Sequence, residues 1–141
     1  MDQTNNDPIN PNHYKGLFAL RNVETIDVSR HLDFDLGNYY KYLARLYKKD
    51  DPVQDFNKAK WYANDWIDHH HAKTKEGLLI NPCWEGAYAV FSLLCWPEPY
   101  TELYDRFLLM RVAVSPQISP VGWHNLLDNY EAEYLKKVAH K

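Results

Sequence analysis

The break between two helical patterns in the first half of the chain restricts the fold more than any other feature. One pattern covers residues 36–49 and the next covers residues 52–71, so only two or three residues separate them. Asp51 is a good N-cap, Pro52 suits the first helical position, and Gln54 completes a capping box. Because connections this short make consecutive helices antiparallel neighbours, the sequence predicts a helical hairpin.

Each helix of this hairpin carries an apolar stripe at helical spacing, and Asp35 is the expected N-cap of the first helix. Such stripes are the faces that a helix buries against its neighbours. The first stripe consists of Leu36, Tyr39, Tyr40, Leu43 and Tyr47, and the second of Val53, Phe56, Ala59, Ala63, Trp66 and Ile67.

The rest of the chain is also helical in pattern, with a short helix expected over residues 23–32 and a connection over residues 72–83. Ser119 before Pro120 is a further helix cap. No strand-like alternation competes with these patterns, so the predicted fold is all-α, a compact helical domain of five to six helices built on the hairpin. The three later patterns are marked by Trp84, Tyr88, Phe91 and Cys95, by Leu103, Phe107 and Met110, and by Trp123, Leu127, Tyr130, Tyr134 and Val138.

The chain reads as one domain preceded by a polar segment. Residues 1–12 are rich in Asn, Asp and Pro and are expected to be flexible. The single helical domain is expected over residues 13–141, with the hairpin part over 13–72 and an aromatic-rich extension over 73–141. At 141 residues, 45% of them hydrophobic and 15% aromatic, the chain can bury a substantial core.

Charge and hydropathy exclude several classes of partner. A net charge of −3 gives no broad basic surface, so nucleic acid is not expected as the main partner. The longest apolar run, residues 86–96, is too short for a membrane span, and the N-terminus lacks the regions of a secretory signal. We therefore expect a protein of the cytoplasm with no membrane partner.

No glycine-rich phosphate loop is present, but the first predicted helix of the hairpin offers a substitute. Gly37 and Asn38 fall in its first turn, where backbone N–H groups favour an anion, and Lys41 and Arg45 follow one and two turns later. This edge has the features of a phosphate-binding surface. A solvated helix face whose cations pair with nearby carboxylates explains the same residues.

The second helix of the hairpin adds polar residues that are expected to face this edge. In an antiparallel pair, Asp55 and Lys58 lie near Arg45, and Tyr62 supplies an aromatic wall. A groove with convergent polar groups is where a ligand binds. An internal ladder of salt bridges is an equally good interpretation.

A metal site is a further candidate. Glu24 and Asp27 form a carboxylate pair at i, i+3 spacing, as Asp65 and Asp68 do on another helix. Helical nucleotide pyrophosphohydrolases hold Mg²⁺ through such pairs. The consecutive histidines at 69–71 point in different directions on a helix and cannot all face one ion.

The order of the motifs resembles a known family. "NPNHY", "VETIDV", "FDLGNYYKYLAR" and "KKDDPVQDFNKAKWYANDWI" occur in this order. Over about residues 8–68 they are similar in sequence and spacing to the SaV-like family of small bacteriophage proteins, catalogued as a domain of unknown function. Some members in small coliphages are described as nucleoside monophosphate kinases that lack a Walker motif and act on deoxynucleotides.

The resemblance implies a phage-encoded, nucleotide-related protein in the host cytoplasm, with Mg²⁺ as cofactor if it is an enzyme. It assigns no catalytic residue. The residues that it implies for nucleotide or phosphate binding are His13, Tyr14, Asn38, Lys41, Tyr42, Arg45, Asp55, Lys58 and Tyr62.

Two other functions remain open. The first is a non-enzymatic inhibitor that contacts a host enzyme or immune complex, for which the aromatic residues of the second half supply a partner surface or a homo-oligomeric contact. The second is a binder that sequesters a signalling nucleotide without converting it.

Overall fold

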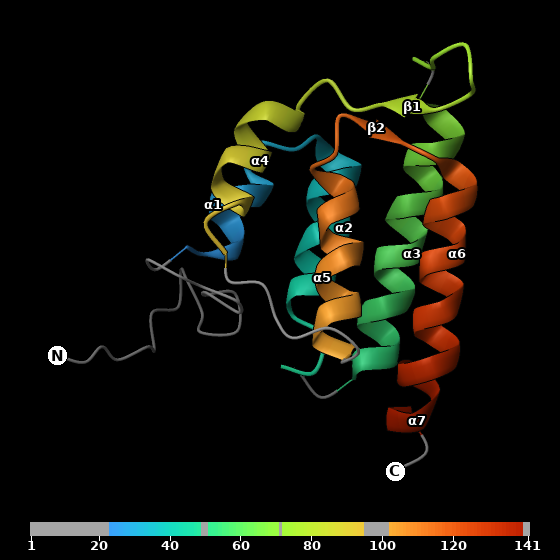
Figure 1. The fold of residues 1–141 in the computed structure, drawn as a ribbon. Helices are drawn as coiled ribbons and strands as arrows, with labels where there is room; N and C mark the ends of the chain where they lie inside the picture. Colours follow the sequence, from blue (N-terminus) through green and yellow to red (C-terminus); the bar gives the residue numbers. More distant parts are fainter. Residues whose placement is uncertain (1–22, 49–50, 71, 95–101, 140–141) are drawn as a thin grey trace, which may run out of the picture.

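The computed structural model describes residues 23–48, 51–70, 72–94 and 102–139, and its long helices lie side by side (Figure 1). The fold is mostly α-helical, as predicted. The helices are α1 (Thr25–Ser29), α2 (Phe34–Ala44), α3 (Pro52–His69), α4 (Trp84–Phe91), α5 (Glu102–Ala113), α6 (Pro120–Tyr130) and α7 (Lys136–Ala139), with a π-helical turn (Glu131–Leu135) joining the last two.

The predicted hairpin of α2 and α3 is confirmed (Figure 1). At its closed end, Arg45 after α2 forms an ion pair with Asp55 in the first turn of α3. At its open end, the indole Nε1 of Trp66 in α3 donates to a carboxylate oxygen of Asp33 before α2, at 2.7 Å. Asp51 caps α3 as expected, its side chain accepting from the backbone N–H of Gln54.

The predicted N-cap of α2 was wrong by two residues. Asp33 holds the cap position, with an extended backbone and a side-chain oxygen 2.8 Å from the N–H of Leu36. The second carboxylate oxygen of Asp33 accepts a hydrogen bond from Trp66, a residue far along the chain. Asp35 instead lies inside the first turn of α2.

Helix α2 also ends earlier than predicted, at Ala44 rather than near residue 49. Tyr47 adopts a left-handed backbone with φ of 68°, a conformation that stops a helix. Contacts with later helices accompany this turn: buried Arg106 of α5 donates to the Leu46 carbonyl, and the Tyr130 hydroxyl donates to that of Tyr47. Tertiary contacts thus accompany the early end of the helix.

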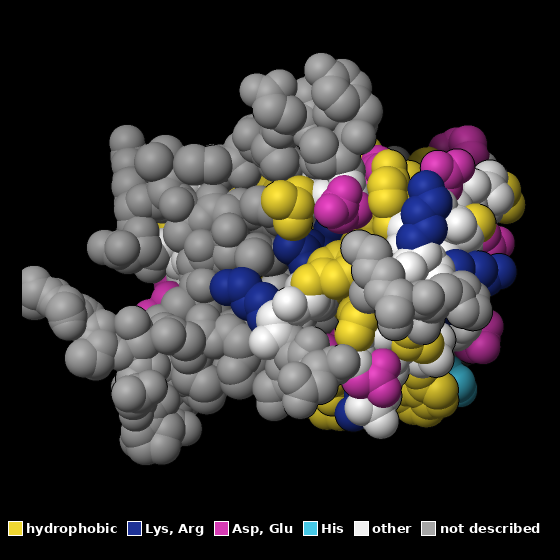
Figure 2. All heavy atoms as spheres, turned by 90° about the horizontal axis from the view of Figure 1, so that it is seen from below, with side chains coloured by type: hydrophobic (Ala, Val, Ile, Leu, Met, Phe, Trp, Pro, Cys, Tyr) yellow, Lys and Arg dark blue, Asp and Glu magenta, His cyan; other side chains and the backbone are white. Residues whose placement is uncertain are grey.

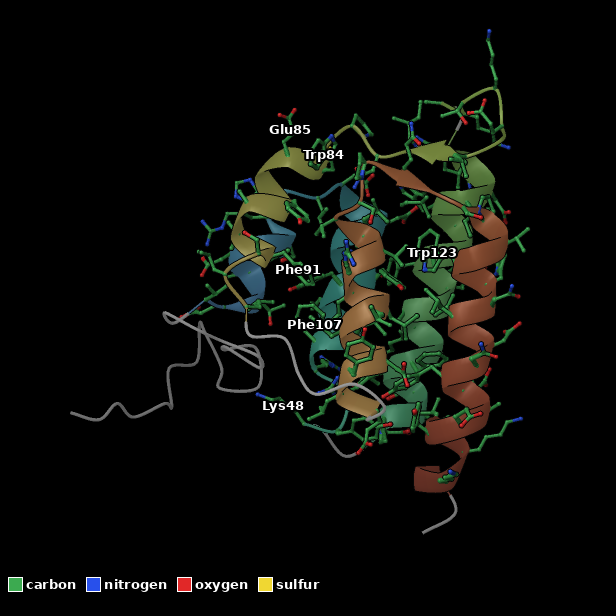
Figure 3. The ribbon with its side chains drawn as sticks, viewed as in Figure 1. Lys48, Trp84, Glu85, Phe91, Phe107 and Trp123 are labelled. Carbon is green, nitrogen blue, oxygen red and sulfur yellow. The ribbon has the colours of Figure 1, made fainter. Side chains whose placement is uncertain are left out.

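The core lies where α2, α3, α5 and α6 meet, and the predicted stripes supply it. Tyr39 is fully buried, its hydroxyl donating to the Leu109 carbonyl at 2.7 Å and accepting from Trp123 Nε1 at 2.8 Å. Phe91 of α4 and Phe107 of α5 point toward one another, with ring centroids 4.7 Å apart (Figure 3). Three residues of the predicted stripes are only partly buried, at the edge of the core: Tyr47, Val53 and Ile67.

A two-stranded antiparallel sheet was not predicted. Strand β1 (Leu79–Ile80) pairs with β2 (Gln117–Ile118) in the register Leu79 to Ile118 and Ile80 to Gln117. Beside it, buried Asn81 donates to the Ala113 carbonyl and accepts from the N–H of Cys83. Strands of two residues are too short to produce a recognisable alternation in the sequence.

Candidate ligand-binding site

The outward face of the α2–α3 hairpin gathers three cations around one aromatic ring. The half-buried ring of Tyr42 has the Lys41 ammonium 4.6 Å and the Arg45 guanidinium carbon 4.9 Å from its centroid. The Lys58 ammonium reaches it from α3, at 5.4 Å. The ring face attracts each cation, so Tyr42 holds together positive charges that otherwise repel one another. We call Lys41, Arg45 and Lys58 the cationic triad.

A row of aromatic residues continues from Tyr42 across the hairpin. Tyr42 stacks on Tyr62 of α3, with centroids 6.0 Å apart and planes 13° apart. Tyr62 meets Phe34 edge-on at 5.8 Å and Trp61 edge-on at 5.1 Å. The outer members of this aromatic row lie in solvent, since Phe34 is 73% exposed and Trp61 is 60% exposed.

Within the triad, Arg45 is paired with a buried carboxylate. Its Nη2 and Nε lie 2.8 Å and 3.1 Å from the same oxygen of Asp55, and the two side chains are 14% and 3% exposed. The other oxygen of Asp55 is buried and has no hydrogen-bond partner among the described residues. The predicted proximity of Arg45 and Asp55 is therefore observed, and in this pair the salt-bridge interpretation holds.

The two lysines of the triad differ from Arg45. Across the residues that the structure describes, no carboxylate lies within 4.0 Å of the Lys41 or the Lys58 ammonium. By contrast, Lys60, two residues along α3, pairs with Glu131 at 3.0 Å. Two positive charges thus converge on Tyr42 without a paired carboxylate, which favours an anion at this place.

Two surface depressions lie beside the triad. One has a volume of about 410 Å³ and is lined by Asp51, Val53, Gln54, Asn57, Lys58 and Trp61. The other has a volume of about 300 Å³ and is lined by Ser29, Arg30, Leu32, Asp33, Phe34, Gly37, Asn38 and Lys41. Each depression contains one triad lysine and one exposed aromatic residue, and Tyr62 contacts both of those aromatic residues.

The expected backbone cradle at Gly37 and Asn38 is not formed. Because Asp33 caps the helix, the N–H of Leu36 is bonded to its side chain and the N–H of Gly37 to its carbonyl, at 2.9 Å. The Asn38 amide is turned back onto the Phe34 carbonyl at 2.8 Å. Gly37 has a packing role, since a Cβ there would lie 3.3 Å from the Ser29 carbonyl oxygen.

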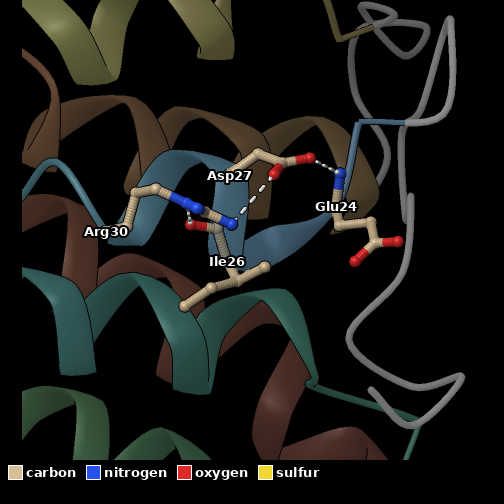
Figure 4. Close-up of polar contacts among 4 residues, drawn as sticks. All are labelled: Glu24, Ile26, Asp27 and Arg30. Carbon is tan, nitrogen blue, oxygen red and sulfur yellow. Dashed lines mark hydrogen bonds and ion pairs between the residues drawn. The ribbon is translucent and has the colours of Figure 1, made fainter. Parts of the chain in front are cut away.

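Glu24 and Asp27, the pair named first for a metal, both have structural partners. One oxygen of Asp27 accepts from the backbone N–H of Glu24 at 2.9 Å, and the other lies 3.3 Å from Arg30 (Figure 4). The pair forms the capping box of α1. Among the described residues no three His, Cys, Asp or Glu side chains are grouped so as to hold a metal ion.

The sequence did not predict a contact between two acidic residues of the hairpin. Asp35 of α2 lies beside Asp65 of α3, and its pKa is raised to about 6, first by burial and then by the hydrogen bond with Asp65. The charges of Asp65 and Asp33 raise it further. These carboxylates lie toward the open end of the hairpin, so the closed end is the more favourable place for an anion.

Sequence reasoning named most of the cluster but missed its aromatic ends. The structure brings together six of the expected residues, Lys41, Tyr42, Arg45, Asp55, Lys58 and Tyr62. Asn38 lines one of the depressions. Phe34 and Trp61 were not named as site residues. Their positions outside the apolar stripes were the available signal. His13 and Tyr14 lie outside the described residues.

Charged and hydrophobic side chains are mixed on the described part of one further face. On the face seen in Figure 2, the described Lys and Arg side chains are interspersed with hydrophobic and acidic ones. None of the described helices combines the length and the apolar character required to cross a bilayer.

Part of the chain matches a known protein family. The family described as "Protein of unknown function (DUF3310)" matches residues 9–64, which include α1, α2 and most of α3. No curated protein and no solved structure matches the chain. The matched segment thus contains the cationic triad and the aromatic row, while α4 to α7 lie beyond it.

Proposed function

We propose that this is a nucleotide-handling protein of the SaV-like bacteriophage type, which binds the phosphate of a nucleoside monophosphate at the cationic triad. The observation that supports the proposal is the convergence of Lys41, Arg45 and Lys58 on the Tyr42 ring, with no paired carboxylate for either lysine among the described residues.

Each member of the triad has a distinct role in this proposal. Lys41 and Lys58 donate to phosphate oxygens, because their ammonium groups are compact charges on flexible stems and can close on the anion from two helices. Arg45 is fixed by Asp55 and contributes its field rather than a mobile donor. Tyr42 holds the cations in place.

Phosphoryl transfer is the reaction to test at this site, since the resembled family includes proteins described as nucleoside monophosphate kinases. The expected metal ligand Asp27 does not fit that role well, because its carboxylate is bonded to the Glu24 backbone N–H and to Arg30. We therefore assign binding to the described residues and no catalytic step. Recovery of the nucleotide intact after incubation with a phosphoryl donor indicates a sequestering protein, and conversion indicates a kinase.

Calorimetric titration with deoxynucleoside monophosphates tests the proposal. Lys41→Ala and Lys58→Ala are each expected to weaken binding by about 10-fold, the effect of one charge-assisted contact. Lys75→Ala is the matched control, because this exposed lysine lies in the loop after α3, and it should leave the affinity unchanged. Absence of binding by the wild-type protein, or equal loss in the control, contradicts the proposal.

Contact with a host protein is the second candidate, and the exposure of Phe34 and Trp61 favours it. It predicts that a host-lysate pull-down captures one protein in stoichiometric amount. The capture should disappear in the double variant Phe34→Ala/Trp61→Ala. Nucleotide turnover should be absent from both the wild-type protein and this variant. A nucleotide affinity that depends on the two lysines supports the first candidate instead.

A further inference from the structure

The depression beside Trp61 contains the elements of a nucleobase site. Trp61 is 60% exposed on α3 and contacts Tyr62 edge-on. A tryptophan of this exposure leaves a large apolar face in water, and that face is the platform on which a base stacks. Exposed aromatic area alone does not identify the ligand. The residues around Trp61 indicate which ligand fits.

The other lining residues supply groups that read the edge of a base. Gln54, Asn57 and Trp61 recur at helical spacing on one exposed side of α3, and all three line the same depression. Side-chain amides carry both a donor and an acceptor, the combination that pairs with the edges of purine and pyrimidine bases. Asp51 already accepts from the N–H of Gln54 as the cap of α3.

Lys58 connects this depression to the proposed phosphate site. It lines the depression with Trp61, and its ammonium lies 5.4 Å from the Tyr42 centroid. The two sites are also joined through the rings, because Tyr62 contacts both Tyr42 and Trp61. A ligand with an anionic group at one end and an aromatic ring at the other fits both sites together.

We propose that the depression lined by Gln54, Asn57, Lys58 and Trp61 is the base site for the nucleotide whose phosphate binds the cationic triad. This inference rests on the proposed function and adds to it the position of the base. It places the base on the α3 side of the aromatic row, at Trp61, and not in the second depression at Phe34.

The test compares two ligands on one protein. Wild-type protein is titrated with deoxyadenosine monophosphate and with deoxyribose 5-phosphate, which carries the same phosphate without the base. The nucleotide is expected to bind about 10-fold more tightly, the contribution of one stacked base. Trp61→Ala should remove this difference by weakening only the nucleotide, and Trp61→Phe should retain most of it because a ring remains.

Phe34→Ala is the matched comparison, since Phe34 is also largely exposed and also touches Tyr62. It should leave the difference between the two ligands unchanged. The base site is overturned if the two ligands bind wild-type protein equally, or if Phe34→Ala and not Trp61→Ala removes the difference. In those cases the phosphate site still stands, whereas failure of both ligands to bind overturns the proposed function along with the base site.

Fluorescence provides a second readout that a structural role of Trp61 would not change. Stacking of a base on the indole should alter its emission when deoxyadenosine monophosphate is added. That change should be absent from Trp61→Phe, which still binds, and absent from wild-type protein titrated with deoxyribose 5-phosphate. An emission change that persists in Trp61→Phe comes from another tryptophan and contradicts the base site.

Discussion

Two tyrosines on α2, three residues apart, show how different the two faces of the hairpin are. On the inner face, the Tyr39 hydroxyl has a donor in Trp123 and an acceptor in Leu109, and the ring is fully buried. On the outer face, Tyr42 is half-buried and surrounded by three cations. The inner face satisfies its polar groups within the protein, whereas the outer face gathers charge that an external anion can neutralise.

The largest expected effect distinguishes the two faces by the cost of removing a tryptophan. Trp123→Ala should lower the free energy of unfolding by about 4 kcal/mol, because it opens a cavity in the core and removes the donor to Tyr39. Trp61→Ala should change it by about 0.5 kcal/mol or less, since that ring is mostly exposed. Denaturant unfolding of both variants measures the contrast. Equal losses would mean that Trp61 belongs to the core.

The ion pair at the closed end of the hairpin should behave as a buried one. Arg45→Ala leaves Asp55 buried without its partner and should cost about 3 kcal/mol. Arg30→Ala breaks an exposed pair with Asp27 and should cost about 0.5 kcal/mol. Thermal unfolding followed by circular dichroism compares the two. If the double variant Arg45→Met/Asp55→Leu is less stable than Arg45→Ala, desolvation of Asp55 is not the main cost.

Removing one hydroxyl from each face gives a smaller and sharper contrast. Tyr39→Phe should lower the free energy of unfolding by about 2 kcal/mol, because the Trp123 N–H is left buried without its acceptor and the Leu109 carbonyl loses the hydroxyl that donates to it. Tyr42→Phe should be within about 0.5 kcal/mol of wild type and keep the ring that faces the cations. Unfolding of the two variants in urea measures the difference between their free energies of unfolding. Similar losses would show that the outer hydroxyl also has a structural role.

The smallest effect concerns pH and the acidic end of the hairpin. Because the pKa of Asp35 is raised from 3.8 to about 6, the folded state binds a proton there more tightly than the unfolded state does. This contribution to stability is present below about pH 4 and is lost as the pH rises through about 6. Asp35→Asn should remove that slope and be more stable than wild type at pH 7, by about 1 kcal/mol after solvent screening.

The control for this experiment is Asp128→Asn, which alters an exposed carboxylate on α6. Its stability should follow the wild-type pH dependence between pH 4 and 7. Persistence of the wild-type slope in Asp35→Asn would place the titrating group elsewhere.

Local signals explain why the sequence predicted the hairpin so closely. The cap at Asp51, the proline at the first helical position and the short connection all lie within a few residues of one another. From the antiparallel arrangement, the approach of Arg45 to Asp55 follows directly. Most of the candidate site is therefore a consequence of local sequence.

The sequence predictions were wrong where contacts between residues far apart in the sequence accompany the local structure. The cap at Asp33 rather than Asp35 coincides with a hydrogen bond from Trp66, which lies 33 residues later. The early end of α2 coincides with contacts from Arg106 and Tyr130, and the pairing of β1 with β2 joins segments with two helices between them. No local pattern carries this information.

The most direct test of the central claim is a titration of isotopically labelled protein with deoxyadenosine monophosphate, followed residue by residue by NMR. We expect the largest chemical-shift changes on Lys41, Tyr42 and Arg45 of the α2 side and on Lys58, Trp61 and Tyr62 of α3, while the core around Trp123 stays unchanged. Shift changes confined to α4 to α7, or none at all at millimolar nucleotide, would contradict it.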